Sequence, residues 1–363
     1  MTTATSAPPH QMAAGHLPRW APWALLGACF AISGAVFTFA NAGSDLAELN
    51  VAGLLFIGMV LYVVAIFVIS TLAESRRHAI DRLMTALVAT AFVIACLPLA
   101  SVVWTVVING IGRFDAEFFT YTMRNVLGEG GGAVHAIWGT VIITLLATVI
   151  SVPVGLMTSI YLVEYGEGRK LARAITFFVD VMTGIPSIVA GLFIYAAFAL
   201  ILGPGIRMGI MGALALSVLM IPVVVRGSEE MLRIVPNELR EASYALGVPK
   251  WLTIVKIVLP TSIAGIMTSV MLAIARVIGE TAPLLLTAGF THSLQTNPIE
   301  MDNGNMMTLP VFVYNQYIMP GTDFAAAHGR AWAAALTLIL IVMALNLVAR
   351  LVAKFFAPKM TGR

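Results

Sequence analysis

Residues 236–260 read PNELREASYALGVPKWLTIVKIVLP, a polar insert between two long apolar runs. Pro236 and Asn237 are typical of a helix start, and Gly247 followed by Pro249 predicts where that helix stops. A second short helix is expected to run from there to the end of the stretch. The insert is therefore predicted to be a helix, a glycine turn and another helix.

The first of these helices carries a stripe of small and apolar side chains on one face. The stripe residues fall at positions i, i+3, i+4 and i+7, and they are Leu239, Ala242, Ser243 and Leu246. A helix lying on a membrane surface would be expected to carry Trp or Phe on this face. Small residues favour close docking into a groove of another protein, which is the preferred of the two interpretations.

The rest of the chain is too apolar for a water-soluble protein. Of the 363 residues, 59% are hydrophobic and 11% are charged, whereas soluble domains carry about 25% charged residues. This excludes a soluble enzyme, a secreted disulfide scaffold and a disordered chain, and it predicts an all-α integral membrane protein. The net charge of +3 is too small to indicate nucleic-acid binding, and the two cysteines show no metal-binding spacing.

Eight apolar stretches are long enough to cross a bilayer, which takes about 20 residues. We place them near 21–43, 51–72, 84–108, 134–163, 174–201, 208–226, 257–288 and 332–356. The fourth, fifth and seventh exceed one crossing, so they are expected to tilt, to project from the bilayer or to kink at Pro153, Pro186 or Pro260. Residues 1–19 and 357–363 are expected to be cytoplasmic tails.

The distribution of basic residues predicts the orientation. With eight spans, both termini lie on one side, and most of the 21 Lys and Arg residues fall on that side. The positive-inside rule assigns it to the cytoplasm. Residues 227–256 are then cytoplasmic, while 109–133 and 289–331 face outward. The second outer loop contains a run from Leu309 to Ile318 that fits either a short helix or a re-entrant piece.

A pair of charges lies within the seventh span. Arg276 and Glu280 are one helical turn apart, which predicts that they share a face and can interact. Gly279 leaves room there for another backbone or a ligand, and Pro283 is expected to break the helix just beyond. Because a charge in mid-membrane costs at least about 2.5 kcal/mol, the pair is expected to have a structural or functional role. It is either a structural ion pair or part of the path of an anionic substrate, since arginine suits oxyanions.

Three further polar residues are expected to be structural. Asp180, near the cytoplasmic start of the fifth span, is predicted to be an interfacial or helix-packing carboxylate. His135, beside a glycine triplet at the outer entrance of the fourth span, is expected at the membrane interface rather than in a metal site. Ser187 has no histidine and aspartate arranged with it, so no catalytic residue is predicted.

Several positions of the polar insert match a known motif. They are Glu241-Ala242-Ser243, Gly247 six positions after Glu241, Ile257 and Leu259-Pro260. This pattern resembles the EAA motif of ABC importer permeases, with Ser243 replacing the second alanine. The resemblance implies that Glu241 pairs with a basic residue of a separate ATPase and that Gly247 forms the turn of a coupling helix. The implied coupling residues are Leu239, Arg240, Glu241, Ala242, Ser243, Leu246 and Gly247.

Four stretches carry a more specific resemblance, namely residues 130–166, 184–193, 239–251 and 279–288. They resemble the PstA-type permeases of phosphate-specific ABC importers, over about residues 84–356. The sister PstC-type permeases share Gly-Glu-Thr but typically continue with Met-Ala-Val, where this chain has Ala-Pro-Leu. The resemblance implies a type I ABC importer permease core with a substrate path of Arg276, Glu280 and Thr281, preceded by two additional transmembrane helices in residues 20–83.

The resemblance also implies partners and a mechanism. A PstC-type permease would complete the pore, a PstB-type ATPase dimer would bind ATP and Mg, and a PstS-type phosphate-binding protein would dock on the outer loops. The chain has no phosphate-binding loop of the Gly-x-x-x-x-Gly-Lys-Ser/Thr type. It is therefore expected to be a transport subunit without a cofactor of its own, not an enzyme, working by alternating access in a bacterial plasma (inner) membrane.

Other functions stay open on the residues alone. A proton-coupled secondary transporter can also carry Arg and Glu within the membrane. A permease for another oxyanion, such as molybdate or sulfate, would share the same arginine. A membrane scaffold that only anchors an ATPase is the least favoured, because it gives no reason for paired charges in mid-membrane.

Overall fold

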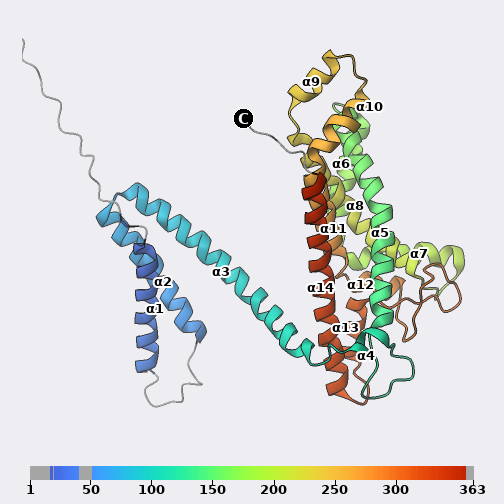
Figure 1. Cartoon of the computed structure of the whole chain (residues 1–363), viewed down its shortest axis with the longest axis horizontal. Coiled ribbons are helices and arrows are strands. Elements are labelled where there is room, and N and C mark those ends of the chain that lie inside the picture. Colours follow the sequence, from blue (N-terminus) through green and yellow to red (C-terminus); the bar gives the residue numbers. More distant parts are fainter. Residues whose placement is uncertain (1–16, 19, 41–50, 357–363) are drawn as a thin grey trace, which may run out of the picture. The chain divides into compact units, whose positions relative to one another are not determined.

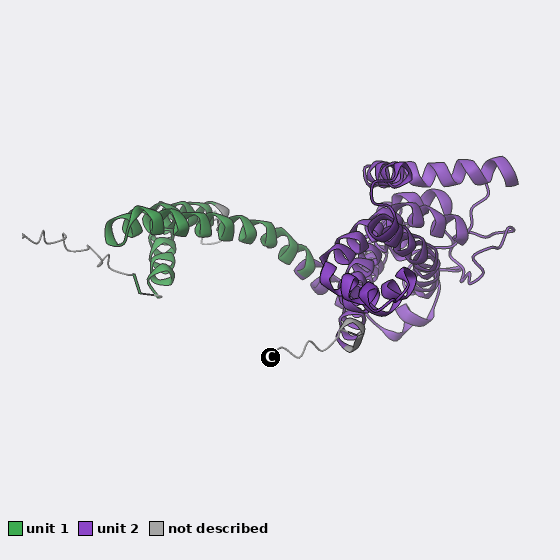
Figure 2. Ribbon diagram, turned by 90° about the horizontal axis from the view of Figure 1, so that it is seen from above, with its two compact units in different colours: residues 1–103 green, residues 104–363 purple. Residues whose placement is uncertain are grey.

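The computed structural model describes residues 17–18, 20–40 and 51–356. The described part is all-helical and contains no strand, as the composition predicts. Its contacts divide the chain into two units, residues 1–103 and 104–363, which Figure 2 distinguishes by colour. Except for residues 17 and 18, the predicted tails lie outside the described residues.

The first unit is formed by three apolar helices, α1 (Ala21–Ala40), α2 (Val51–Ala73) and the first part of α3 (Arg76–Ile111). α1 packs against α2, and the Ser33 hydroxyl donates a hydrogen bond to the Leu54 carbonyl oxygen at 2.8 Å. All three helices are long and apolar enough to cross a membrane. The division between the units falls within α3, which is one continuous helix.

The second unit is a bundle around α8 (Gly209–Ile234), which is buried along most of its length. α5 (Val134–Ile160) and α11 (Leu259–Val277) pack against α8, and α14 (Phe324–Phe356) packs on α11 (Figure 1). Glycines allow close approach between these helices. A Cβ atom added at Gly155 of α5 would lie 2.7 Å from the Val224 side chain of α8.

The predicted fifth span is broken. Residues 174–201 form two helices, α6 (Lys170–Thr183) and α7 (Ser187–Leu202), that meet at an angle of 108°. The break follows Gly184, and Pro186 stands immediately before α7. Proline cannot donate a backbone hydrogen bond and forces the preceding residue out of the helical conformation, which explains the position of the break. The described chain thus has seven candidate spans plus this bent pair.

The seventh predicted span, 257–288, is also not one helix. The helix begins earlier, with α10 (Lys250–Thr253) and the π-helical η3 (Ile254–Val258), and α11 ends at Val277. A turn over 278–281 then leads into the short α12 (Ala282–Thr287). The break was expected at Pro283, just beyond Arg276 and Glu280, but it falls between these two residues, because Gly279 together with Pro283 disfavours a continuous helix here.

The two connecting regions lie at opposite ends of the bundle (Figure 1). α9 (Asn237–Ala245) and α10 form one end, whereas α4 (Ala116–Thr120) and α13 (Leu309–Ile318) lie toward the other. α13 decides the alternative left open for this run, because it is a helix packed against α14. This separation is what the predicted topology requires of the loops at 227–256 and at 109–133 and 289–331.

We predict that Gly139→Ala destabilises the second unit. A Cβ atom at Gly139 of α5 would overlap the Met307 carbonyl oxygen, and a helix and a backbone segment packed this closely cannot separate without losing contacts. Overpacking of this kind costs about 1–3 kcal/mol. Thermal unfolding of the purified protein in detergent measures the effect. Gly329→Ala is the matched control, because a Cβ there meets no atom within 4 Å. An unchanged unfolding midpoint for Gly139→Ala would contradict the packing described here.

Candidate functional site

The polar insert folds as a helical hairpin, as predicted. α9 ends at Ala245, and Gly247 has a φ of +76°, a left-handed conformation that favours glycine. The Gly247 N–H donates to the Tyr244 carbonyl oxygen at 2.9 Å, and the Val248 N–H donates to that of Ser243 at 3.2 Å. These two hydrogen bonds close the end of α9, and α10 begins after Pro249. We call residues 236–253 the coupling hairpin.

The residues of the predicted stripe on α9 differ in their burial. Ser243 is buried, and its hydroxyl lies 2.8 Å from the Thr253 hydroxyl, so it joins α9 to α10 inside the hairpin. The large apolar side chains exposed on the hairpin are Leu239, Tyr244, Leu246 and Trp251. Glu241 and Ala242 are exposed beside them. An exposed group of large apolar side chains on a short segment is typical of a protein-binding surface.

Arg240 fastens the coupling hairpin to the bundle. Its Nε and Nη2 donate to Glu164 Oε1 at 3.1 and 3.0 Å. Its two Nη atoms also donate to the carbonyl oxygens of Val235 at 2.6 Å and Leu232 at 2.9 Å. The side chains are 12% exposed for Arg240 and 4% for Glu164. Arg240 is therefore an internal contact of this chain and not part of the exposed surface of the hairpin.

No role was predicted for Glu164. A charged residue directly after an apolar run of membrane-spanning length is a signal that could have pointed to it. It lies in η2 (Tyr161–Tyr165), a π-helical turn that continues α5. Such turns frequently mark functional positions in helices. The Arg240–Glu164 contact thus connects the coupling hairpin directly to α5, and the carbonyl contacts connect it to the end of α8.

A second chain of charges joins α6 to α8. Arg226 pairs with Asp180 and, at 2.9 Å, with Glu229 Oε2. Arg233 pairs with the other Glu229 oxygen at 2.8 Å. Asp180 is thus a helix-packing carboxylate, which is one of the two roles predicted for it.

The predicted pair of Arg276 and Glu280 does not form. Arg276 lies in the last turn of α11, and Glu280 lies in the following turn, where the helical spacing no longer applies. Neither side chain makes an ion pair or hydrogen bond with residues 17–18, 20–40 or 51–356. Thr281 immediately precedes α12 as its N-cap, and its carbonyl oxygen accepts a hydrogen bond from Leu285 N–H at 3.0 Å. The structure places all three residues at one break between helices, with an exposed arginine that no carboxylate of the described chain neutralises.

Comparisons with known proteins identify the family. The family model of the binding-protein-dependent transport system inner membrane component matches residues 151–362. The phosphate transport system permease protein PstA 1 of Mycobacterium tuberculosis (strain CDC 1551 / Oshkosh) is 46% identical over 287 residues, which are 78% of this chain and 91% of that protein. The chain belongs to the PstA family of permeases.

Further relatives agree with this assignment. The phosphate transport system permease protein PstA of Yersinia pestis is 38% identical over 299 residues, which are 80% of this chain and 96% of the relative. A structure of the inward facing MetNI methionine ABC transporter matches with a TM-score of 0.51 at 20% identity, over 62% of this chain and 95% of that chain. At this identity the match shows the fold alone, which is that of a type I ABC importer permease. The PstA-family chain is thus a multi-pass membrane permease subunit.

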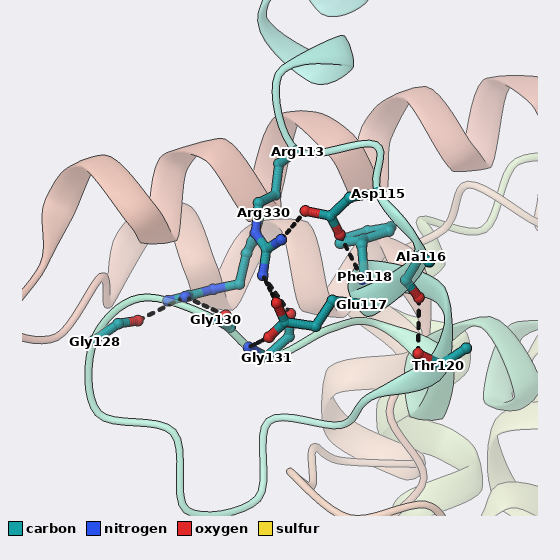
Figure 3. Close-up of polar contacts among 10 residues, drawn as sticks. All are labelled: Arg113, Asp115, Ala116, Glu117, Phe118, Thr120, Gly128, Gly130, Gly131 and Arg330. Carbon is teal, nitrogen blue, oxygen red and sulfur yellow. Dashed lines mark hydrogen bonds and ion pairs between the residues drawn. The ribbon is translucent and has the colours of Figure 1, made fainter.

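The opposite end of this PstA-family permease holds a polar network that the sequence did not reveal (Figure 3). Arg113 pairs with Asp115 and, at 3.5 Å, with Glu117, and it donates to the Gly131 carbonyl oxygen at 2.9 Å. Glu117 in turn accepts from the Gly131 N–H at 2.8 Å. Gly130 and Gly131 have φ values of +88° and +70°, so the glycine triplet that begins with them forms a turn in which other residues would be strained.

Arg330 of α14 closes the same network from the other side. It is 4% exposed, and Nη1 donates to the carbonyl oxygens of Gly128 and Gly130 at 2.8 and 3.0 Å. Its Nε donates to Gln316 Oε1 at 2.9 Å. His135, next to this turn, was expected at the membrane interface. It is instead buried, with its ring edge-on to Phe312. The loop before α5 is therefore held by Arg330 of α14, which in turn donates to Gln316 of α13.

We predict that Arg240→Gln loosens the coupling hairpin. Removing one partner of a buried ion pair leaves the other charge uncompensated, which costs about 3–5 kcal/mol. Limited proteolysis of the purified chain should then show faster cleavage within residues 236–249, and Arg240→Gln combined with Glu164→Gln should recover much of the resistance. Arg233→Gln is the control, because its side chain is 64% exposed and such pairs contribute little. Equal cleavage of Arg240→Gln and the wild-type chain would contradict the fastening role.

Proposed function

We propose that this chain is the PstA-type permease subunit of an ATP-driven importer of inorganic phosphate. The observation that carries the proposal is the 46% identity, over 91% of its length, to a relative named as a phosphate transport permease. The implied partners are a PstC-type permease, a PstB-type ATPase dimer that binds ATP and Mg, and a PstS-type phosphate-binding protein. Both termini and the coupling hairpin lie in the cytoplasm of a bacterial cell, and the network of Arg113 and Arg330 faces outward.

The coupling hairpin transmits the movement of the ATPase in this proposal. Glu241 and the exposed apolar side chains of the hairpin contact the ATPase, with Leu246 the most exposed at 83%. Gly247 and Ser243 give the hairpin its shape. Arg240 passes the force inward, because it joins the hairpin to Glu164 at the end of α5 and to the end of α8. When ATP binding closes the ATPase dimer, α5 and α8 move with the hairpin and the pore opens outward.

Arg276, Glu280 and Thr281 line the phosphate path in the same proposal. The helix break after Val277 leaves the Arg276 guanidinium without a carboxylate partner, so it can offer its donors to a tetrahedral anion. Glu280 adjusts the field of the arginine, which prevents the anion from being held too tightly to leave. Exposure of Arg276 in this chain fits a pore completed by a second permease.

Uptake of labelled phosphate into proteoliposomes tests the function. The chain is reconstituted with its permease, ATPase and binding-protein partners, and phosphate entry is measured with and without ATP in the absence of a proton gradient. ATP-dependent uptake is expected. Uptake driven by a proton gradient without ATP would favour a secondary transporter. Stronger inhibition of uptake by molybdate or sulfate than by unlabelled phosphate would assign another oxyanion.

We predict that Arg276→Gln lowers phosphate uptake in this assay by roughly 10- to 100-fold while the complex still assembles. The estimate corresponds to losing a hydrogen bond to a charged group, which contributes about 1.5–3 kcal/mol. Arg350→Gln, an exposed arginine of α14, is the control and should keep full uptake. Normal uptake by the Arg276 variant would remove this residue from the phosphate path.

We also predict that Glu241→Lys separates the permease from its ATPase. Reversing an exposed charge at a docking surface places like charges against each other. Co-purification of the ATPase, followed by ATP hydrolysis stimulated by the binding protein, measures the effect, and at least one of the two should fall severalfold. Asp81→Lys, at an exposed position near the start of α3 and outside both the hairpin and the outer loops, is the control. Unchanged association and unchanged stimulation would show that Glu241 is not a contact.

A further inference from the structure

A polar pocket of about 340 Å³ lies where α6 begins and α8 ends. Three arginines line it, Arg169 and Arg173 from α6 and its preceding turn and Arg233 from α8. Thr176 continues the row along α6, because positions 169, 173 and 176 share one helix face. The pocket is separate from the coupling hairpin surface and from the break at Arg276, and the transport mechanism above makes no use of it.

The pocket has more positive charge than the protein itself neutralises. Both oxygens of Glu229 are already engaged by Arg226 and Arg233. Arg169 and Arg173 form no ion pair with the described part of the chain, although the exposed Glu167 also lines the pocket. Like charges four residues apart on a helix repel each other by a few tenths of a kcal/mol. A bound anion would relieve this repulsion.

The chemistry of the lining selects the kind of anion. Guanidinium groups present planar pairs of donors that match the oxygens of a phosphate group, and the Thr176 hydroxyl adds a further donor. Phe177, one helical turn beyond Arg173, lies beside this row and is 63% exposed, whereas Leu171 and Phe178 are exposed on the opposite side of α6. A phosphate group attached to an acyl chain would satisfy the arginines and Phe177 at once, since α6 puts the arginines at its first turns and Phe177 farther along.

We propose that this pocket binds the phosphate group of an anionic phospholipid, with an acyl chain against Phe177 of α6. The same lining chemistry would accept free inorganic phosphate, so the experiment distinguishes the two sources. The inference does not rest on the nature of the transported anion. Basic pockets between membrane helices on the cytoplasmic side are suited to anionic head groups, because that leaflet is negatively charged.

Native mass spectrometry of the purified importer complex tests the proposal. The complex is exchanged into detergent with phosphatidylglycerol or phosphatidylcholine, and retained lipid is counted for the wild type, for R169Q/R173Q and for K170Q. Lys170 gives the same type of charge change on the same turn but does not line the pocket. Size-exclusion profiles confirm that each variant is folded. A parallel titration with inorganic phosphate follows displacement of the lipid and the thermal midpoint of each variant.

We expect the wild type and K170Q to retain phosphatidylglycerol in preference to phosphatidylcholine, and R169Q/R173Q to retain at least fivefold less. If phosphate stabilises the wild type and K170Q but not R169Q/R173Q, and no lipid is retained, the site is a phosphate site with a soluble source. Equal retention by all three proteins, or equal loss in K170Q and R169Q/R173Q, overturns the proposal. Loss of the ATPase from R169Q/R173Q with unchanged lipid would assign the arginines to a protein contact and would also overturn it.

Discussion

The buried contact between Arg240 and Glu164 fixes the coupling hairpin to the bundle, and the coupling that we propose for this permease depends on it. A short hairpin with exposed apolar side chains cannot transmit force unless it is fixed to the membrane-spanning bundle. Arg240 provides that fixation, because it donates to Glu164 at the end of α5 and to two carbonyl oxygens near the end of α8. Its side chain is turned toward the bundle, unlike the exposed neighbours Leu239 and Glu241 on the same helix.

The charges of the second unit fall into two groups. Some charges near the ends of the bundle are paired or hydrogen-bonded, as Asp180 with Arg226 and Arg330 with the glycine turn show. Charges in the helix break at Arg276 and Glu280 are not paired within the described chain. A charge is expensive in an apolar environment. The paired groups hold helices together, and for the unpaired ones we propose that an anion or another subunit supplies the missing partner.

Several elements could be predicted from the sequence for physical reasons that act locally. Hydrophobicity predicts the apolar spans, and turn chemistry predicts the hairpin with its turn at Gly247. Spacing along one helix predicts the exposure of Leu246. The pairing of Arg276 with Glu280 failed because it assumed a continuous helix, and Gly279 with Pro283 made the shorter helix more favourable. The angle of 108° between α6 and α7 could not be predicted either, because proline determines where a helix ends but not the direction of the next helix.

The sequence by itself determined that this chain spans a membrane, which segment forms the polar helical hairpin, and which family it belongs to. Hydropathy and short motifs carry that information because each depends on residues close together in the chain. Only the tertiary structure decided that Arg240 meets Glu164, 76 positions away, that Ser243 is buried, and that Arg169, Arg173 and Arg233 line one pocket. Contacts of this kind depend on how separate helices pack, and no local pattern specifies which of their polar side chains will face each other.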